Sequence, residues 1–140
     1  MGRPDLNHSH AEIRDIGIVD DDEPLREALG SVLKAAGFSI DTFASAEEFL
    51  DSPHRERIAC LILDVRLPGM SGIELQRRLL DVAWFTPIIF VTAHGDASLR
   101  DLVMQAGAAG FLNKPVRSEA LLQQIRAVLA ESESIRRSNR

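Results

Sequence analysis

The sequence is poor in cysteine, in aromatic residues and in positive charge, and it contains no long apolar run. Cys60 is its only cysteine, so no disulfide can form within the chain, and the apolar neighbours of Cys60 favour a small core residue over a reactive thiol. Its 16 Lys and Arg against 21 Asp and Glu leave a net charge of −5, which disfavours direct binding of nucleic acid. No apolar stretch approaches the roughly 20 residues of a membrane helix, which predicts a cytoplasmic protein without a membrane span.

The length of 140 residues suffices for one domain and leaves no room for a second. A hydrophobic content of 45% is enough for a core without disulfide or metal support, and it is too high for a disordered chain. Residues 1–12 are polar and lack an apolar period, which predicts a flexible leader. We therefore expect the fold in residues 13–131 and a polar tail or linker, rich in Ser and Arg, in residues 132–140.

Short apolar runs alternate with helical patterns throughout the expected domain. The runs predict strands at residues 16–19, 39–43, 59–63, 87–91 and 109–112. The segments between them carry apolar residues at helical spacing, with capping boxes that begin at Ser45 and Ser71 and helix stops at Gly37 and Gly107. Five strand–helix units predict an α/β fold with right-handed crossovers, in which helices cover both faces of an open parallel sheet.

In such sheets, chemistry is found at the carboxyl ends of the strands. Polar side chains follow four of the five predicted strands: Asp20, Asp21 and Asp22, then Asp64, Thr92 and Lys114. Carboxylates that crowd together repel one another unless a cation lies between them, and an all-oxygen ligand set favours Mg²⁺, or Mn²⁺, over zinc. Because a lysine binds phosphate as a point charge and a threonine hydroxyl donates to phosphoryl oxygens, the set predicts a phosphoryl-transfer site.

Each of these signals also has a simpler explanation. Three aspartates before a helix often serve as N-cap and dipole charges, a threonine at a strand end reflects β-propensity, and a Lys-Pro pair forms turns. The joint occurrence at four strand ends, in this order, is what favours the functional interpretation.

Four segments resemble the receiver domain of two-component response regulators, and in particular its FixJ-like subgroup. They are residues 18–24 (IVDDDEP), 63–72 (LDVRLPGMSG), 91–96 (VTAHGD) and 106–115 (AGAAGFLNKP). The resemblance covers residues 13–131, and four motifs in the same order and spacing are far more specific than any one of them. It implies a flavodoxin-like, doubly wound (βα)5 fold with a five-stranded parallel sheet in the order 2-1-3-4-5.

The resemblance also assigns roles to individual residues. Asp64 is similar to the phospho-acceptor, whose carboxylate attacks phosphorus to form an aspartyl phosphate. It implies that Asp20 and Asp21, together with Asp64 and the backbone carbonyl of Arg66, bind Mg²⁺. Lys114 would balance the charge of the transferred group.

Two residues resemble the conformational switch of the family. Thr92 would hydrogen-bond to the phosphoryl group, and Phe111 would swing into the space that Thr92 vacates. The alternative for Phe111 is a plain core residue. The resemblance further implies a cis peptide bond between Lys114 and Pro115.

Two residues beside the expected site are particular to this chain. Arg66 lies two positions after Asp64, and His94 lies two positions after Thr92. Both flank the direction from which water would attack an aspartyl phosphate, so they are predicted to set its lifetime. The equally weighted alternative is that both are solvated loop residues.

The resemblance implies a sensor histidine kinase or a phosphotransfer protein as the phosphoryl donor. It implies a signalling domain that catalyses only its own phosphorylation and dephosphorylation, and not an enzyme acting on a separate substrate. The fourth helix, near residues 97–106, and the fifth strand offer a surface for a homodimer or another partner, although the sequence alone favours a plain solvent-facing helix. FixJ-like regulators commonly carry a helix-turn-helix output domain, so a role in transcription control is a further expectation.

Three rival interpretations fit the sequence less well. A phosphatase of the haloacid-dehalogenase type requires a second aspartate two residues after the nucleophile, where this chain has Arg66. A flavodoxin-like flavin protein requires phosphate-binding Gly, Ser or Thr after the first strand, where this chain is acidic. A receiver-shaped module that is never phosphorylated is disfavoured by the intact acid, threonine and lysine set.

Overall fold

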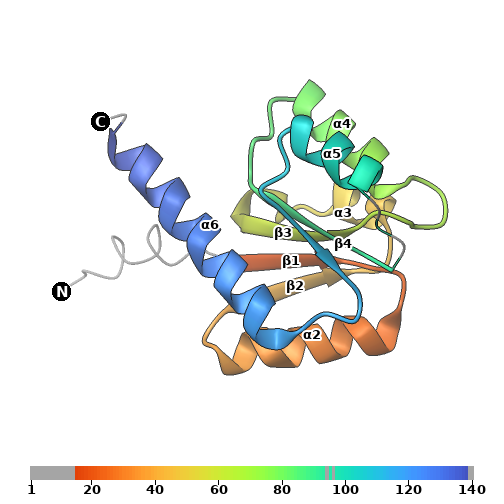
Figure 1. The fold of residues 1–140 in the computed structure, drawn as a ribbon, viewed down its shortest axis with the longest axis horizontal. Coiled ribbons are helices and arrows are strands. Elements are labelled where there is room, and N and C mark those ends of the chain that lie inside the picture. Colours follow the sequence, from red (N-terminus) through yellow and green to blue (C-terminus); the bar gives the residue numbers. More distant parts are fainter. Residues whose placement is uncertain (1–14, 94, 96, 139–140) are drawn as a thin grey trace.

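The computed structural model describes residues 15–93, 95 and 97–138; the predicted leader at residues 1–12 and His94 lie outside these residues. The chain forms one parallel sheet in the order β2-β1-β3-β4-β5, with helices on both faces (Figure 1). The strands are β1 (Asp15–Val19), β2 (Ser39–Phe43), β3 (Ile58–Asp64), β4 (Ile88–Thr92) and β5 (Gly110–Asn113). The helices are α2 (Glu23–Ala35), α3 (Ala46–Asp51), η1 (Arg55–Arg57), α4 (Gly72–Asp81), α5 (Ala97–Gln105) and α6 (Ser118–Ser138). The predicted doubly wound, flavodoxin-like fold is confirmed.

The sheet separates two apolar cores because successive strand residues point to opposite faces. Helices α3, α4 and α5 cover one face, where Leu61 and Leu63 of β3 contribute to the core. Helices α2 and α6 cover the other face, where Cys60 and Ile62 lie. Burial raises the pKa of the Cys60 thiol to about 12, so this cysteine is the unreactive core residue that its neighbours predicted.

Serine side chains cap the starts of α3 and α4. Ser45 Oγ accepts a hydrogen bond from Glu48 N at 3.0 Å, and the Glu48 carboxylate reaches back to Ala44 N at 2.6 Å. Ser71 Oγ accepts from Glu74 N at 3.1 Å and so starts α4. The predicted serine caps are therefore present. The second half of each capping box differs from the prediction, because Glu48 binds the N–H of the residue before the cap and Glu74 binds neighbouring arginines.

The helix ends follow local sequence except at α6. Gly37 and Gly107 adopt φ values of +98° and +105° just after α2 and α5, as predicted for left-handed helix stops. In contrast, α6 continues to Ser138 through the segment predicted to be a linker-like tail. Residues 132–138 contain no glycine or proline, and Glu and Arg favour helix, so a helix that is already anchored on the sheet continues through them. Its last turns project beyond the sheet (Figure 1).

No helix within the described part of the chain combines the length and the apolar character that crossing a membrane requires.

Candidate functional site

The residues that sequence analysis singled out meet at the carboxyl edge of the sheet. Asp20 follows β1, Asp64 ends β3, Thr92 ends β4 and Lys114 follows β5. The register pairs Asp64 with Val91 and Thr92 with Asn113, so residues far apart in sequence end their strands side by side. Parallel pairing alone therefore brings the acids, the hydroxyl and the amine together.

Lys114 bridges the two buried acids. Its Nζ lies 2.9 Å from Asp20 Oδ2 and 3.0 Å from Asp64 Oδ2. Asp20 and Asp64 are only 3% and 5% exposed, so both carboxylates have lost most of their hydration. One ammonium thus joins the ends of β1, β3 and β5 and offsets the repulsion between the two acids.

Asp21 completes a group of three carboxylates with Asp20 and Asp64. One oxygen from each residue lies within 4.8 Å of the other two, which is close enough for a single ion to contact all three. Asp21 is exposed while the other two are buried, so the group opens to solvent on one side. The three oxygens, with room for water, fit a hard divalent cation such as Mg²⁺.

Asp22 is the one aspartate of the run that serves as a helix cap. Its Oδ1 accepts a hydrogen bond from Leu25 N at 3.2 Å, at the start of α2. Its own backbone N–H donates to Asp20 Oδ1 at 2.9 Å and thereby orients that carboxylate. The simple N-cap explanation therefore holds for Asp22, whereas Asp20 and Asp21 face the site.

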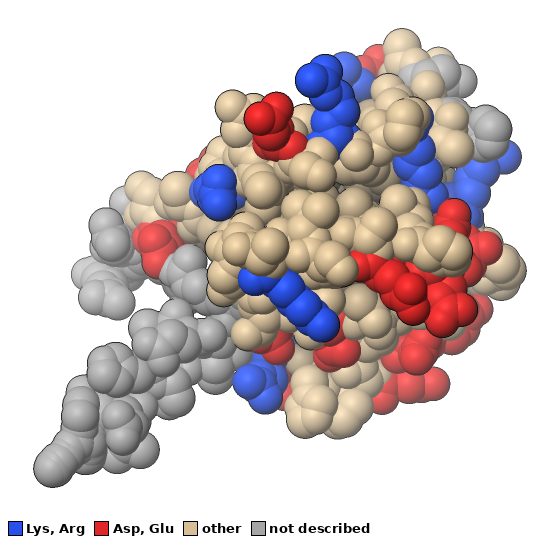
Figure 2. Space-filling model, turned by 90° about the horizontal axis from the view of Figure 1, so that it is seen from below, with Lys and Arg blue, Asp and Glu red and all other residues tan. Residues whose placement is uncertain are grey.

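Acidic side chains also gather on one side of the site. Figure 2 shows Asp and Glu gathered at the right-hand edge of the molecule, the end at which α2 begins in Figure 1. Asp21, Asp22, Glu23 and Glu27 are exposed in this region of the chain. A negative patch of this kind raises the local concentration of cations.

The protonation of the site follows from burial and pairing. Burial raises the pKa of Asp64, and the neighbouring Asp20 charge adds to this, while the hydrogen bond from Lys114 opposes both. Burial by itself would lower the pKa of Lys114, but hydrogen bonds to Asp20 and Asp64 outweigh it, so that the pKa is raised. Lys114 therefore stays cationic at neutral pH.

The backbone of the loop after β3 hydrogen-bonds to the Asp64 side chain. Arg66 N donates to Asp64 Oδ1 at 3.2 Å, and Gly72 N donates to Val65 O at 2.9 Å. The Arg66 side chain is exposed, so its backbone and not its side chain is fixed beside the acid.

The remaining predicted residues that the structure describes belong to β4 and β5. Thr92 is fully buried, and its carbonyl accepts from Lys114 N at 2.9 Å. The Lys114–Pro115 peptide bond is cis, as the resemblance implied. Phe111 is partly buried and packs against the core on the α3, α4 and α5 face.

Residues 16–126 match the family described as the response regulator receiver domain. The chain belongs to this family. Membership decides against the phosphatase and flavin-protein alternatives.

Relatives of this receiver domain are signalling proteins. The response regulator protein TodT of Pseudomonas putida is 44% identical over 124 residues, which cover 89% of this chain and 55% of TodT. The transcriptional regulatory protein FixJ of Bradyrhizobium diazoefficiens is 36% identical over 88% of this chain and 60% of FixJ. A CheY-like receiver domain protein from Methanospirillum hungatei aligns with a TM-score of 0.80 at 29% identity, over 86% of this chain and 97% of that chain. The receiver domain spans about half the length of the curated relatives it matches.

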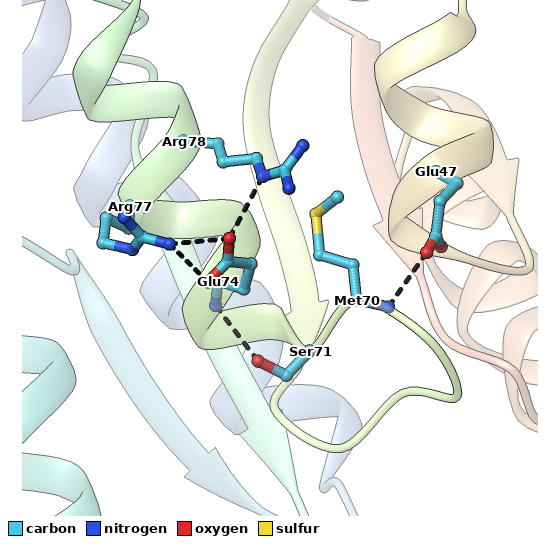
Figure 3. A network of polar contacts seen from close by, with 6 residues as sticks. All are labelled: Glu47, Met70, Ser71, Glu74, Arg77 and Arg78. Carbon is cyan, nitrogen blue, oxygen red and sulfur yellow. Dashed lines mark hydrogen bonds and ion pairs between the residues drawn. The ribbon is translucent and has the colours of Figure 1, made fainter.

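Two side-chain to backbone hydrogen bonds of this receiver domain were not predicted from the sequence. Arg26 of α2 donates from Nη1 to the Asp20 carbonyl at 2.6 Å. Glu47 of α3 accepts from Met70 N at 2.9 Å in the loop between β3 and α4 (Figure 3). No motif signals either residue, because each acts through its side chain on the backbone of another segment.

Proposed function

We propose that this receiver domain accepts a phosphoryl group on Asp64 from a sensor histidine kinase or a phosphotransfer protein. A carboxylate oxygen of Asp64 forms the new bond to phosphorus, while the bond from phosphorus to the donor's imidazole nitrogen breaks and the imidazole keeps the electron pair. The observation that carries this proposal is the Lys114 ammonium, 3.0 Å from Asp64 and 2.9 Å from Asp20, beside the three-carboxylate group. The product is an aspartyl phosphate.

The residues that would hold Mg²⁺, or Mn²⁺ in its place, are Asp20, Asp21, Asp64 and Arg66, the last through its backbone carbonyl. The close approach of three carboxylates supports this ligand set. When bound, the ion offsets negative charge on the phosphoryl oxygens.

The chain's own residues supply position and charge, which is most of what phosphoryl transfer requires. Lys114 remains cationic and holds the Asp64 carboxylate in place before transfer. After transfer its ammonium lies beside the phosphoryl oxygens. The Thr92 hydroxyl then donates a hydrogen bond to the phosphoryl group from the end of β4.

In this proposal, phosphorylation changes a partner surface through Thr92 and Phe111. Thr92 moves toward the phosphoryl group and Phe111 moves inward behind it. Phe111 lines a surface groove of about 290 Å³ together with Arg100, Met104, Gln124 and Glu131. A movement of the Phe111 ring would therefore change the shape of this groove, which supports a surface that responds to phosphorylation. Exposed Leu102 on α5 favours the use of α5 and β5 by a homodimer or another partner.

The switch is tested by Phe111→Ala. We expect the variant to accept phosphate at the normal rate while its phosphorylation-dependent dimerisation, followed by light scattering, is lost. Unchanged coupling between phosphorylation and dimerisation would discard the switch role and leave Phe111 as a core residue.

The proposal includes a lifetime role for Arg66 and His94. The exposure of the Arg66 side chain next to Asp64 is consistent with a role in guiding or blocking water. Arg66→Ala and His94→Ala should change the dephosphorylation rate, measured as loss of label over time. Decay at the wild-type rate in both variants would end this part of the proposal.

The wider role is proposed from the relatives. TodT is a response regulator protein and FixJ a transcriptional regulatory protein, which supports a place in two-component signal transduction and control of transcription. The receiver would act in the cytoplasm, as a signalling domain and not as an enzyme with a separate substrate, and an output domain rather than the receiver would contact DNA.

The deciding experiment is phosphorylation by acetyl phosphate with Mg²⁺. Intact-mass spectrometry should show one added phosphoryl group on the wild type, and Asp64→Asn should abolish it. Asp81→Asn, an exposed aspartate at the end of α4, is the matched control and should react like the wild type. No uptake by the wild type from acetyl phosphate or from a phosphorylated histidine donor would favour an interaction module that is never phosphorylated.

A further inference from the structure

Glu47 reaches from α3 to the loop between β3 and α4. Its Oε2 accepts a hydrogen bond from Met70 N at 2.9 Å, across 23 positions of sequence (Figure 3). Gly69 has φ +77°, and a Cβ on Gly69 would lie 2.7 Å from the same Glu47 oxygen. Gly69 therefore leaves room for the Glu47 carboxylate at this position, where a side chain would force the carboxylate to shift.

The rest of the loop is fastened by other means. Val65 and Leu67 are buried in the core, and Gly72 N is bonded to Val65 O at 2.9 Å. These contacts hold both ends of the loop, but Pro68 and Gly69 at its tip are exposed. Beside the tip, the partly buried Met70 side chain packs against the core, and the bond from Met70 N to Glu47 ties the backbone of this part of the loop to α3.

The surroundings of Glu47 keep it ionised. The Met70 N–H holds the pKa of the Glu47 carboxyl below its usual range, and the positive charge of Arg78 adds to this effect. Figure 3 shows Arg78 extending from α4 on the far side of Met70, where its Nε lies 3.1 Å from Glu74 Oε2. The bond to Met70 is thus made by a charged acceptor, which is stronger than a neutral one.

We propose that Glu47 is a positioning residue for the phosphoryl-acceptor site. By holding Met70 it limits the motion of the loop that begins at Asp64, in which Arg66 N donates to Asp64 Oδ1 at 3.2 Å. The inference rests on the proposed function, in which the Arg66 carbonyl is a ligand of Mg²⁺. Without the contact, the loop samples more conformations, and the ligands and the acceptor carboxylate are aligned for a smaller fraction of the time.

Glu47→Ala and Glu47→Gln separate this role from a simple effect of charge. Alanine removes the acceptor, whereas glutamine keeps a side-chain oxygen for Met70 N and removes only the charge. Glu48→Ala is the matched control, because Glu48 is the adjacent residue of α3, is also exposed, and bonds Ala44 N without touching the loop. Three measurements suffice: hydrogen exchange of the Met70 amide, the Mg²⁺ dissociation constant, and the rate of phosphorylation by acetyl phosphate.

In Glu47→Ala the Met70 amide should exchange faster, and both Mg²⁺ affinity and phosphorylation rate should fall by roughly three- to ten-fold, less than the loss caused by changing a direct partner of a metal ligand. Glu47→Gln should recover most of this loss. Glu48→Ala should weaken the start of α3 but leave Mg²⁺ affinity and phosphorylation close to the wild type.

Three results would overturn the inference while leaving the proposed function intact. They are phosphorylation of Glu47→Ala at the wild-type rate, an equal loss in Glu48→Ala, and a Glu47→Gln variant as impaired as Glu47→Ala. A wild-type protein that takes up no phosphoryl group would overturn the proposed function and this inference together.

Discussion

Gly72, the first residue of α4, lies directly against the main-chain carbonyl of Asp64. A Cβ on Gly72 would overlap that oxygen and would lie 3.1 Å from the Cα of Val65. Both neighbours are backbone atoms at the end of a central strand, so they cannot move aside as the tip of a side chain can. Asp64, the proposed phosphoryl acceptor, therefore packs through its backbone against the first residue of α4.

Gly72→Ala should destabilise the domain and disturb Asp64. We expect a loss of about 1–3 kcal/mol in the free energy of unfolding, typical of overpacking, together with slower phosphorylation. Urea denaturation and the acetyl phosphate reaction measure the two effects. Gly30→Ala in α2 is the control, because its Cβ would meet only the flexible end of Ile40, at 2.7 Å. Equal stabilities of the two variants would contradict the argument.

Lys114→Met should make the domain depend on a divalent cation. Without the ammonium, the buried carboxylates of Asp20 and Asp64 face each other uncompensated, and we expect a loss of about 2–4 kcal/mol in the absence of Mg²⁺. Saturating Mg²⁺ should restore part of this stability even though phosphorylation stays slow. Thermal unfolding with and without Mg²⁺ tests this, with exposed Lys34→Met as the control. A melting temperature indifferent to Mg²⁺ would show that Lys114 is not what balances the acids.

Glu74 should make the stability of the domain depend on pH in the acid range. Hydrogen bonds from Arg77, and then Arg78, hold the pKa of Glu74 below its ordinary value of 4.5. A lowered carboxyl pKa contributes stability that is present above pH 4.5 and is lost as the pH falls through the lowered pKa. Glu74→Gln should therefore be slightly less stable than the wild type at neutral pH, with the difference closing below pH 4.5.

The Glu74 effect should also shrink in about 1 M NaCl, because salt screens exposed ion pairs. Urea denaturation across pH and salt measures both dependences. A difference between Glu74→Gln and the wild type that persists unchanged in acid would point to a role for Glu74 other than ion pairing.

Gly95 leaves room for the ring of Phe111. A Cβ on Gly95 would lie 2.6 Å from Phe111 Cζ and 2.6 Å from Asn113 Oδ1. Gly95→Ala should force the ring to move at a cost of roughly 1–2 kcal/mol, and adding Phe111→Leu should recover part of that cost. A double-mutant cycle from urea denaturation should give a coupling of about 0.5–2 kcal/mol, while strictly additive effects would show that the two positions do not interact.

The local sequence contained most of the fold. Strand and helix positions follow from apolar periodicity, and helix starts and stops follow from residues such as Ser45, Ser71 and Gly37, because each acts within a few positions of its own backbone. The end of α6 was the exception. Its polar composition predicted a linker, but helix formation depends on an anchored preceding turn as well as on composition.

The separate roles of Asp20, Asp21 and Asp22 could be assigned only from the tertiary structure. Local sequence makes all three residues equal candidates for a helix cap or a metal site. The structure assigns the cap to Asp22 and brings Asp20 and Asp21 close to Asp64, because the path of the chain after β1 decides which side chain faces β3.

The sequence by itself determined which residue types stand at the ends of the strands, since periodicity places the strands and the motifs identify the family. Only the tertiary structure decided which of these groups touch. The contacts of Lys114 with Asp20 and of Glu47 with Met70 join segments far apart in the chain, and their geometry depends on sheet register and side-chain packing. These are properties of the whole fold, which no local pattern records.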